Sequence, residues 1–348
     1  MDEIEFLESL IAIPSVSGEE DALAEHLLEQ MASIGFRARR DGVGNVIGEL
    51  GDPNARRSIV LLGHMDTVPG HIPLRHEDGR LYGRGAVDAK GPLAAFVLAA
   101  ARVAPGLADT CLLVIGAVGE EAHSRGARHL AQGMTPPDAV IISEPGGWQG
   151  ITLGYKGTLS VDYALTKPVG HGAGDRATSS EEAVAFWNHL VRYTGEQNGD
   201  RRPPRFDTLD PTLRSINTQS DGLEDAVTMR IGLRLPPGAD DEELRERMLD
   251  WSGEASVTFP YHEPAFRTEK NTAVVRALLR AIRRAGGRPR FKLKTGTSDM
   301  NVVGPAWGCS VAAYGPGDSS LDHTPDEHIH LAEFRRAVDV LAQALPEL

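Results

Sequence analysis

The sequence predicts an α/β fold in which a parallel-rich sheet, covered by helices on both faces, forms a domain that carries an inserted α+β module. Short runs rich in Val, Ile and Leu alternate with helix-like segments in the first part of the chain, and such runs are typical of strands buried on both faces. This alternation stops near residue 154 and resumes after residue 262. An apolar content of 41% over 348 residues is enough for a large packed core.

The first part of the chain contains two helical patterns and three strand-like runs. Residues 19–34 repeat apolar side chains at helical spacing up to Gly35, and residues 92–103 form a helix-like segment with a proline near its start. The apolar runs are residues 58–63, 110–118 and 138–143. Strands that alternate with helices predict parallel pairing. The glycine-rich segment 42–48 has the wrong spacing for a dinucleotide-binding loop and predicts a hairpin turn.

The middle of the chain has a different order of elements. It predicts strand, helix, two strands, helix and strand, which is the β-α-β-β-α-β order of a ferredoxin-like module. The ranges are 156–166, 179–194, 212–219, 225–235, 240–251 and 254–261. After His262 the pattern returns to helix, strand and helix, at 268–285, 309–314 and 326–345. We therefore expect residues 1–153 and 263–348 to form one domain, with residues 154–262 inserted into it.

Net charge and cysteine content argue against several classes of protein. The chain has 36 basic and 49 acidic side chains, a net charge of −13, which disfavours binding to nucleic acid. Cys111 and Cys309 are its two cysteines, so a disulfide framework is excluded and a reducing compartment is favoured. The acidic amino terminus does not resemble a signal peptide, and the longest apolar stretch, 92–101, is too short to span a bilayer. We expect a soluble cytoplasmic protein that binds no membrane.

Side chains that can bind metal follow the apolar runs at widely separated positions. They are His64, Asp66, Asp88, Glu120, Glu121, Glu144 and His323. Taken singly, each has an ordinary structural explanation, such as a helix N-cap for Asp88 or a solvated acidic turn for the glutamate pair. The carboxyl ends of successive parallel strands, however, meet at one edge of an open α/β sheet. We therefore expect these side chains to converge around two divalent metal ions, which indicates hydrolysis.

The spacing within this set suggests separate tasks. His64 and Asp66 are two residues apart at a strand end, so the Asp66 carboxylate can hold the second imidazole nitrogen of His64. Asp88 lies in a glycine-dense loop, and its two oxygens can bridge two cations. Of the adjacent pair Glu120 and Glu121, one can bind metal while the other accepts a proton from metal-bound water.

At these residues, and at Ile13-Pro14-Ser15-Val16-Ser17-Gly18, the chain resembles the co-catalytic di-zinc family of aminoacylases, carboxypeptidase G, acetylornithine deacetylase and succinyl-diaminopimelate desuccinylase. The resemblance implies two divalent ions, Zn²⁺ with Co²⁺ as an alternative. It also implies a role for each residue of the set. His64 and Glu144 would hold one ion, Glu121 and His323 the other, and Asp88 both, with Glu120 as general base and Asp66 supporting the ligands from outside the metal shell.

The same resemblance makes residues 154–262 a lid through which two subunits form a homodimer. His171 corresponds to the lid histidine that reaches the active site of the other subunit and steadies the scissile carbonyl. Asn217 and Arg234 fall where the family's lid contacts substrate, although Asn217 could instead cap a turn and Arg234 pair with an acidic neighbour. The segment that resembles a substrate-carboxylate grip comprises Gly296, Thr297 and Ser298.

A short loop between Pro69 and Gly83, a short lid and the run from Gly83 to Ala94 look most like one branch of the family. That branch releases lysine or ornithine from the LysW-type amino-group carrier protein in lysine or arginine biosynthesis. Because such carriers are acidic, Arg201, Arg202, Arg205 and residues 288–294 are candidates for a basic rim. Two alternatives stay open: a deacylase or dipeptidase of small substrates (acetylornithine deacetylase or succinyl-diaminopimelate desuccinylase), and an inactive metal-holding binding protein.

Overall fold

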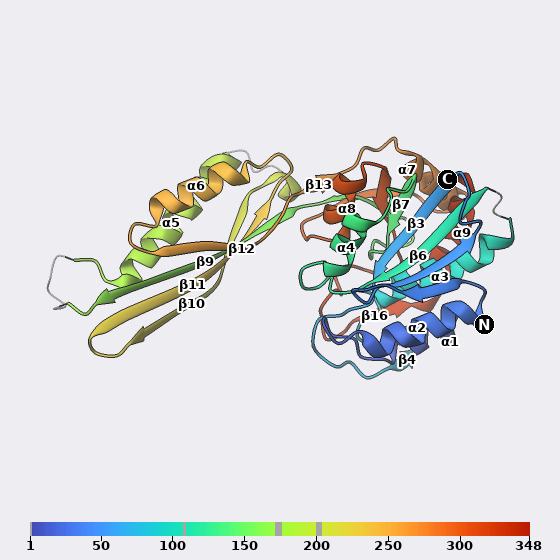
Figure 1. The fold of residues 1–348 in the computed structure, drawn as a ribbon, viewed down its shortest axis with the longest axis horizontal. Helices are drawn as coiled ribbons and strands as arrows, with labels where there is room; N and C mark the ends of the chain where they lie inside the picture. Colours follow the sequence, from blue (N-terminus) through green and yellow to red (C-terminus); the bar gives the residue numbers. More distant parts are fainter. Residues whose placement is uncertain (1, 107–108, 171–175, 200–203) are drawn as a thin grey trace. The chain divides into compact units, whose positions relative to one another are not determined.

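The structure is a computed structural model that describes residues 2–106, 109–170, 176–199 and 204–348. It contains two compact units (Figure 1). The first unit comprises Met1–Gly154, Arg267–Leu293 and Ser298–Leu348, and the second comprises Tyr155–Phe266 and Lys294–Thr297. Among the described residues, no helix is both long and apolar enough to cross a membrane.

A large mixed sheet forms the centre of the first unit. In order across the sheet, its strands are β1 (Arg37–Arg40), β2 (Val46–Gly51), β6 (Thr110–Ala117), β3 (Arg57–His64), β7 (Ala139–Ile142), β15 (Ser310–Ala313), β8 (Gly150–Tyr155) and β13 (Phe266–Arg267), with β14 (Arg290–Lys294) paired to β8. The central pairs β6–β3, β3–β7 and β7–β15 are parallel. The pairs β1–β2, β2–β6 and β15–β8 are antiparallel. The predicted α/β fold class is confirmed, with a parallel centre and antiparallel flanks.

Helices bury the apolar faces of this sheet. One core cluster contains alternate residues of β3 (Ile59 and Leu61) together with side chains from five helices. These helices are α1 (Glu3–Ile11), α2 (Asp21–Ser33), α3 (Lys90–Val103), α7 (Ala273–Arg284) and α9 (Leu331–Ala344). The intervening residues Val60 and Leu62 are also fully buried, so both faces are covered. Two further helices, α4 (Arg125–Gly133) and α8 (Asp299–Trp307), pack against each other.

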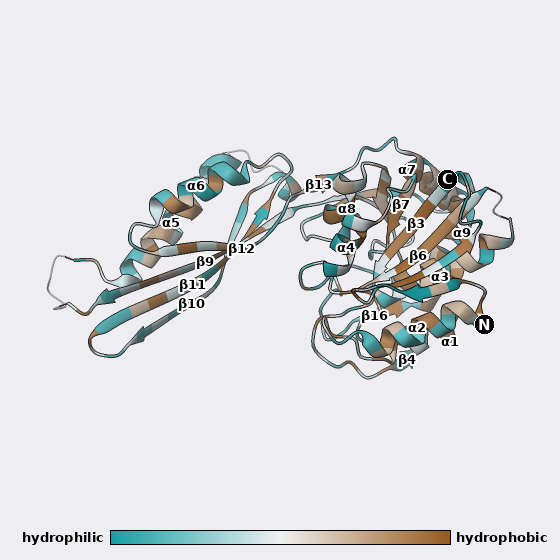
Figure 2. Ribbon diagram, viewed as in Figure 1, coloured by the Kyte–Doolittle hydropathy of each residue, from teal (hydrophilic) through white to brown (hydrophobic). Residues whose placement is uncertain are grey.

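Strand hydropathy differs between the two units (Figure 2). Strands β3, β6 and β7 are almost continuously apolar, as expected for strands covered on both faces. In the second unit, β9 (Gly157–Pro168) alternates between buried and more exposed residues over much of its length, as a sheet with one covered face does. Its four-stranded antiparallel sheet has the order β10 (Asp210–Ser220), β11 (Glu224–Leu235), β9 and β12 (Ser256–Glu263), and its helices are α5 (Ser179–Asn198) and α6 (Asp241–Trp251).

Two smaller features sit beside the main sheet. The predicted hairpin turn is present: residues 41–45 join β1 to β2, and the rest of the glycine-rich segment 42–48 is the start of β2. Asp41 Oδ1 accepts hydrogen bonds from the backbone N–H groups of Val43, Gly44 and Asn45. A three-stranded sheet, missed by the sequence analysis, consists of β16 (His328–His330), β5 (Arg80–Tyr82) and β4 (Arg75–Glu77). This small sheet joins the segment that precedes α3 to the segment that precedes α9.

Candidate metal centre

The parallel strands bring their polar carboxyl ends to one edge of the sheet. β3 ends at His64, whose Cα partner on β6 is Ala117, three residues before Glu120. On its other side, β3 pairs Leu62 with Ile142 of β7, two residues before Glu144. Because all three strands run in the same direction, their ends lie together, as the sequence predicted.

The Asp88 carboxylate lies between two imidazoles. Its Oδ1 is 3.2 Å from His64 Nε2, and its Oδ2 is 3.1 Å from His323 Nε2. His323 Nε2 is also 2.8 Å from Glu121 Oε1, although 202 positions separate the two residues in the chain. Three possible ligand atoms, one each on Asp88, Glu121 and His323, lie within 4.8 Å of one another. This spacing suits a metal ion held by nitrogen and oxygen ligands.

The charges of this cluster favour bound cations. Hydrogen bonds with Asp88 and Glu121 raise the pKa of His323 to about 10. Burial opposes protonation of His64, but hydrogen bonds with Asp66 and Asp88 raise its pKa well above the usual value. Burial acts to raise the pKa of Asp88, but its contacts with both imidazoles lower it overall. The carboxylates therefore favour positive charge at both imidazoles, and they would attract divalent metal in the same positions.

Glu120 is a partly buried acid with other acids nearby. Burial is the largest cause that raises its pKa well above the usual value, and the nearby charges of Glu144, Asp299 and Glu121 add to the effect while His64 opposes it. Glu144 is itself 7% exposed. A carboxylate with a raised pKa near a metal centre can take up and return a proton.

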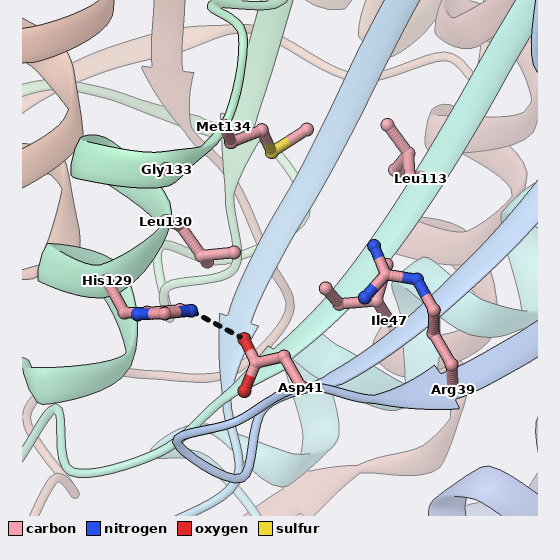
Figure 3. Close-up of a pocket in the computed structure, with 8 residues that line it drawn as sticks. All are labelled: Arg39, Asp41, Ile47, Leu113, His129, Leu130, Gly133 and Met134. Atoms are coloured by element: carbon pink, nitrogen blue, oxygen red, sulfur yellow. Dashed lines mark ion pairs between the residues drawn. The ribbon is translucent and has the colours of Figure 1, made fainter.

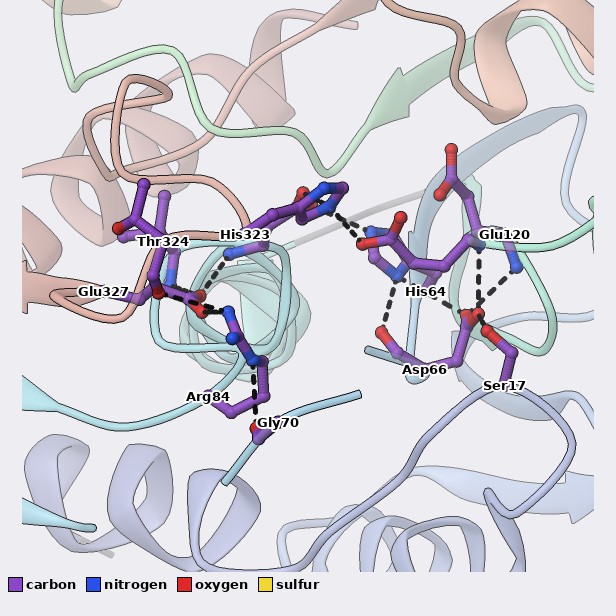
Figure 4. A network of polar contacts seen from close by, with 12 residues as sticks. Ser17, His64, Asp66, Gly70, Arg84, Glu120, His323, Thr324 and Glu327 are labelled. Atoms are coloured by element: carbon purple, nitrogen blue, oxygen red, sulfur yellow. Dashed lines mark hydrogen bonds and ion pairs between the residues drawn. The ribbon is translucent and has the colours of Figure 1, made fainter. Parts of the chain in front are cut away.

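Asp66 contacts the imidazole of His64 and also holds the backbone of the glutamate pair. His64 Nδ1 donates to the backbone oxygen of Asp66 at 2.9 Å, whereas the Asp66 carboxylate is 3.5 Å away. Asp66 Oδ1 instead accepts the N–H of Glu120, and Oδ2 accepts the N–H of Glu121, each at 3.0 Å. Ser17 Oγ also donates to Oδ2, at 2.6 Å (Figure 4). The carboxylate thus fixes the backbone of the glutamate pair, while a carbonyl fixes the imidazole.

The predicted substrate contacts of the second unit lie in separate places. Asn217 is exposed on β10, opposite Thr228 of β11, and lines a cavity of about 360 Å³ on the sheet. Arg234 lies six residues beyond Thr228 on β11, which at strand rise is about 20 Å. Its Nη1 donates to Thr297 Oγ1 at 3.5 Å. One small ligand could not contact both Asn217 and Arg234 from the same subunit.

Three further predicted residues are Ser298, Gly296 and His171. Ser298 Oγ caps α8 by accepting the N–H of Met300, and Asn301 Oδ1 accepts the N–H of Ser298. Gly296, next to Thr297, is partly buried. His171 lies outside the described residues.

A second cavity lies beside the hairpin, away from the predicted site residues (Figure 3). It has a volume of about 280 Å³ and contains an acid and a histidine, Asp41 and His129, whose carboxylate and imidazole are 3.9 Å apart. The Asp41 carboxylate is already used by the hairpin turn and by Asn45 Nδ2, 2.8 Å away. We therefore assign this cavity no part in the chemistry.

A known peptidase family and several curated proteins are similar to this chain. Residues 60–347 match the model of peptidase family M20/M25/M40. The chain is 45% identical to the LysW-lysine hydrolase of Deinococcus radiodurans, over 99% of this chain and 96% of that protein. It is 30% identical to the LysW-lysine/LysW-ornithine hydrolase of Saccharolobus islandicus, over 83% of this chain and 81% of that one.

Solved structures share the fold. An M20 family metallo-carboxypeptidase from Sulfolobus solfataricus superimposes with a TM-score of 0.81 at 20% identity, covering 99% of both chains. A dinuclear metal-binding M20 peptidase of Bacillus subtilis gives a TM-score of 0.72 at 13% identity, covering 99% of this chain and 96% of that one. The chain is a member of peptidase family M20/M25/M40.

Proposed function

We propose that this protein is a metal-dependent amide hydrolase that releases lysine, ornithine or both from a LysW-type amino-group carrier protein. The observation that carries the proposal is 45% identity to a LysW-lysine hydrolase along almost the whole of both chains. The convergence of His64, Asp88, Glu121 and His323 supports it, because a hydrolase of this kind needs a metal centre. A biosynthetic enzyme of this type would work in the cytoplasm.

The residues present fit two divalent ions, which we propose to be Zn²⁺, with Co²⁺ as an alternative. His64 and Glu144 would hold one ion, Glu121 and His323 the other, and Asp88 both. The fit rests on Asp88, whose two oxygens face different imidazoles. When bound, such a pair of ions would polarise an amide carbonyl and lower the pKa of a bound water.

The protein's own groups then have defined tasks. Glu120 accepts the proton of the attacking water at its carboxylate and passes it to the leaving amine nitrogen. Asp66 holds the backbone of Glu120 and Glu121, so the base and the ligand keep their spacing. His171, from the lid of one subunit of a homodimer, donates to the oxygen that gains charge in the other subunit.

The substrate assignments are also part of the proposal. The segment that comprises Gly296, Thr297 and Ser298 would contact the substrate carboxylate. Arg234, whose Nη1 donates to Thr297 Oγ1, would be a further substrate contact. Asn217, which lies far along the sheet from Arg234, would contact a different part of the carrier-borne substrate or the other subunit's substrate. An acidic carrier would meet the basic side chains of Arg205 and of residues 288–294.

The decisive experiment measures free lysine and ornithine after incubation of the zinc-loaded enzyme with each carrier conjugate. We expect release from the conjugates and little cleavage of acetylornithine, succinyl-diaminopimelate or dipeptides. Fast cleavage of a small substrate without release from the carrier would favour the deacylase or dipeptidase alternative. Metal binding without hydrolysis of any of these compounds would favour an inactive binding protein.

Metal binding should release protons. In the metal-free protein His323 is protonated near neutral pH, because its pKa is raised to about 10, and a metal ion must displace that proton. Affinity for Zn²⁺ should therefore rise with pH up to that value and fall at acid pH. Calorimetric titration in buffers of different ionisation enthalpy measures the release; a binding heat independent of the buffer would contradict it.

A further inference from the structure

Glu327 is a fully buried carboxylate that the metal ligands do not include. It lies four residues after His323 and is 0% exposed. Its Oε1 accepts the backbone N–H groups of Val87, at 2.9 Å, and of Asp88, at 3.1 Å. Its Oε2 accepts a hydrogen bond from Arg84 Nη1 at 2.7 Å. A buried charge persists only where such partners replace water, so both oxygens are already committed to protein groups.

Arg84 and Glu327 join the two loops that carry Asp88 and His323 (Figure 4). Besides its bond to Glu327, Arg84 donates from Nη1 to the backbone oxygen of Thr324 at 3.5 Å, and from Nε to that of Gly70 at 3.2 Å. The N–H of Gly83 donates to the backbone oxygen of Glu327 at 3.3 Å. Several hydrogen bonds therefore join the loop after β5 to the loop before β16. Both the carboxylate and the backbone oxygen of Glu327 take part in them.

These hydrogen bonds hold the loops that carry Asp88 and His323, two proposed metal ligands that contact each other. The backbone of Asp88 is held by Glu327 while its carboxylate faces both imidazoles. His323 has a φ of 62°, a left-handed conformation that a non-glycine residue keeps only when its surroundings fix it. Thr324 closes the turn at that point, donating from its N–H and Oγ1 to the backbone oxygen of Leu321, and its own carbonyl meets Arg84.

We infer that Arg84 and Glu327 are positioning residues that set the spacing between Asp88 and His323, and thereby the affinity for the second metal ion and the rate of amide hydrolysis. Neither residue is among the proposed metal ligands or substrate contacts. The inference rests on the proposed function, because the spacing matters only if the centre holds two ions. Sequence analysis missed Glu327, although its position close behind His323 in Thr324-Pro325-Asp326-Glu327 was available as a signal.

The test compares E327Q and R84Q with a matched control. In E327Q, an amide oxygen can still accept from Val87 and Asp88, but the amide N–H₂ then faces the guanidinium of Arg84, which is also a donor. Glu333 is the control, because its Oε1 likewise accepts two backbone N–H groups, from Trp148 and Gly317, without contacting Arg84 or Asp88. Zn²⁺ binding to the metal-free proteins is measured by calorimetry, and Co²⁺ binding by its absorption spectrum.

We expect E327Q and R84Q each to weaken binding of the second Zn²⁺ by about 10- to 100-fold, the effect typical of partners that orient metal ligands. The Co²⁺ spectrum should change, and kcat for the carrier conjugate should fall with little change in KM. The double variant should be no worse than either single one, because the pair acts as a unit. E333Q should keep wild-type affinity.

Wild-type Zn²⁺ affinity and Co²⁺ spectra in both variants would overturn the inference, as would lower thermal stability without any change in metal binding. If E327Q does not fold, the Zn²⁺ affinity, the Co²⁺ spectrum and the kcat of R84Q alone test the inference. Failure of the proposed function would give a different result. The wild-type protein would bind two ions and release nothing from the carrier, while the metal-binding measurements on the variants would still test the role of Glu327.

Discussion

Replacing Glu120 by glutamine is expected to lower kcat for the carrier conjugate by about 10²- to 10⁴-fold, the range typical of a lost general acid–base group. Glutamine keeps the size and the backbone of Glu120, so the N–H that Asp66 accepts stays in place. It cannot accept a proton from water. Zinc content should remain at two ions per chain, because the proposed ligands are unchanged, and KM should change little.

The measurement pairs single-turnover release of lysine with metal analysis of the same sample. Glu29→Gln is a suitable control, because Glu29 is exposed on α2 and the substitution removes the same charge from the same unit. The control should retain full activity. A Glu120→Gln enzyme that kept wild-type turnover would show that another group accepts the proton, while loss of zinc from it would mean that Glu120 binds metal.

The sequence was sufficient to group most of the proposed metal ligands, because the carboxyl ends of neighbouring parallel strands lie at the same edge of a sheet. The apolar runs that became β3, β6 and β7 each precede a candidate side chain, and parallel pairing places their carboxyl ends together. This is why His64 and Glu121 could be grouped although they are far apart in the chain. His323 joins the group through a loop, which the strand pattern alone does not place.

The sequence could not predict all the hydrogen-bond partners of the buried carboxylates, because these depend on which polar groups the loops place beside them. Asp66 was expected to hold the imidazole of His64 because it follows that residue by two positions. Its carboxylate lies 3.5 Å from His64 Nδ1, but it also accepts the amides of Glu120 and Glu121, which was not expected. Those amides donate to whatever acceptor the turn after β6 places beside them, and no side-chain pattern encodes that. The carboxylate of Glu327 is similarly inconspicuous, since an acid just before a short strand usually faces solvent.

Strand register sets the distance between two residues that the sequence analysis predicted to contact substrate. Asn217 and Arg234 were both expected to contact substrate, and each lies on a predicted strand. The pairing of Asn217 with Thr228, however, places Arg234 six residues further along β11. Hydrophobic alternation shows which face a residue occupies but says little about its distance from a residue on a neighbouring strand.

Replacing Asp88 by asparagine should have the second large effect, on metal binding itself. Asparagine retains one carbonyl oxygen, but its amide nitrogen is a donor that cannot bind metal. Since the two oxygens of Asp88 face His64 and His323 separately, the variant should hold one Zn²⁺ per chain where the wild type holds two. Hydrolysis should fall by at least about 100-fold, because loss of one ion removes several kcal/mol of transition-state stabilisation.

Metal analysis and calorimetry measure the number of Zn²⁺ ions bound per chain. The rise in Tm on adding Zn²⁺ gives an independent measure of binding, since a ligand that binds only the native state stabilises it. That rise should be smaller in Asp88→Asn than in the wild type. Asp250→Asn, at an exposed position on α6, removes the same charge and should leave both quantities unchanged. His323→Gln separates the two sites, because it should weaken only the ion shared with Glu121. If Asp88→Asn still bound two ions at wild-type affinity, Asp88 would not be the residue between them, and the proposed division of ligands would be wrong.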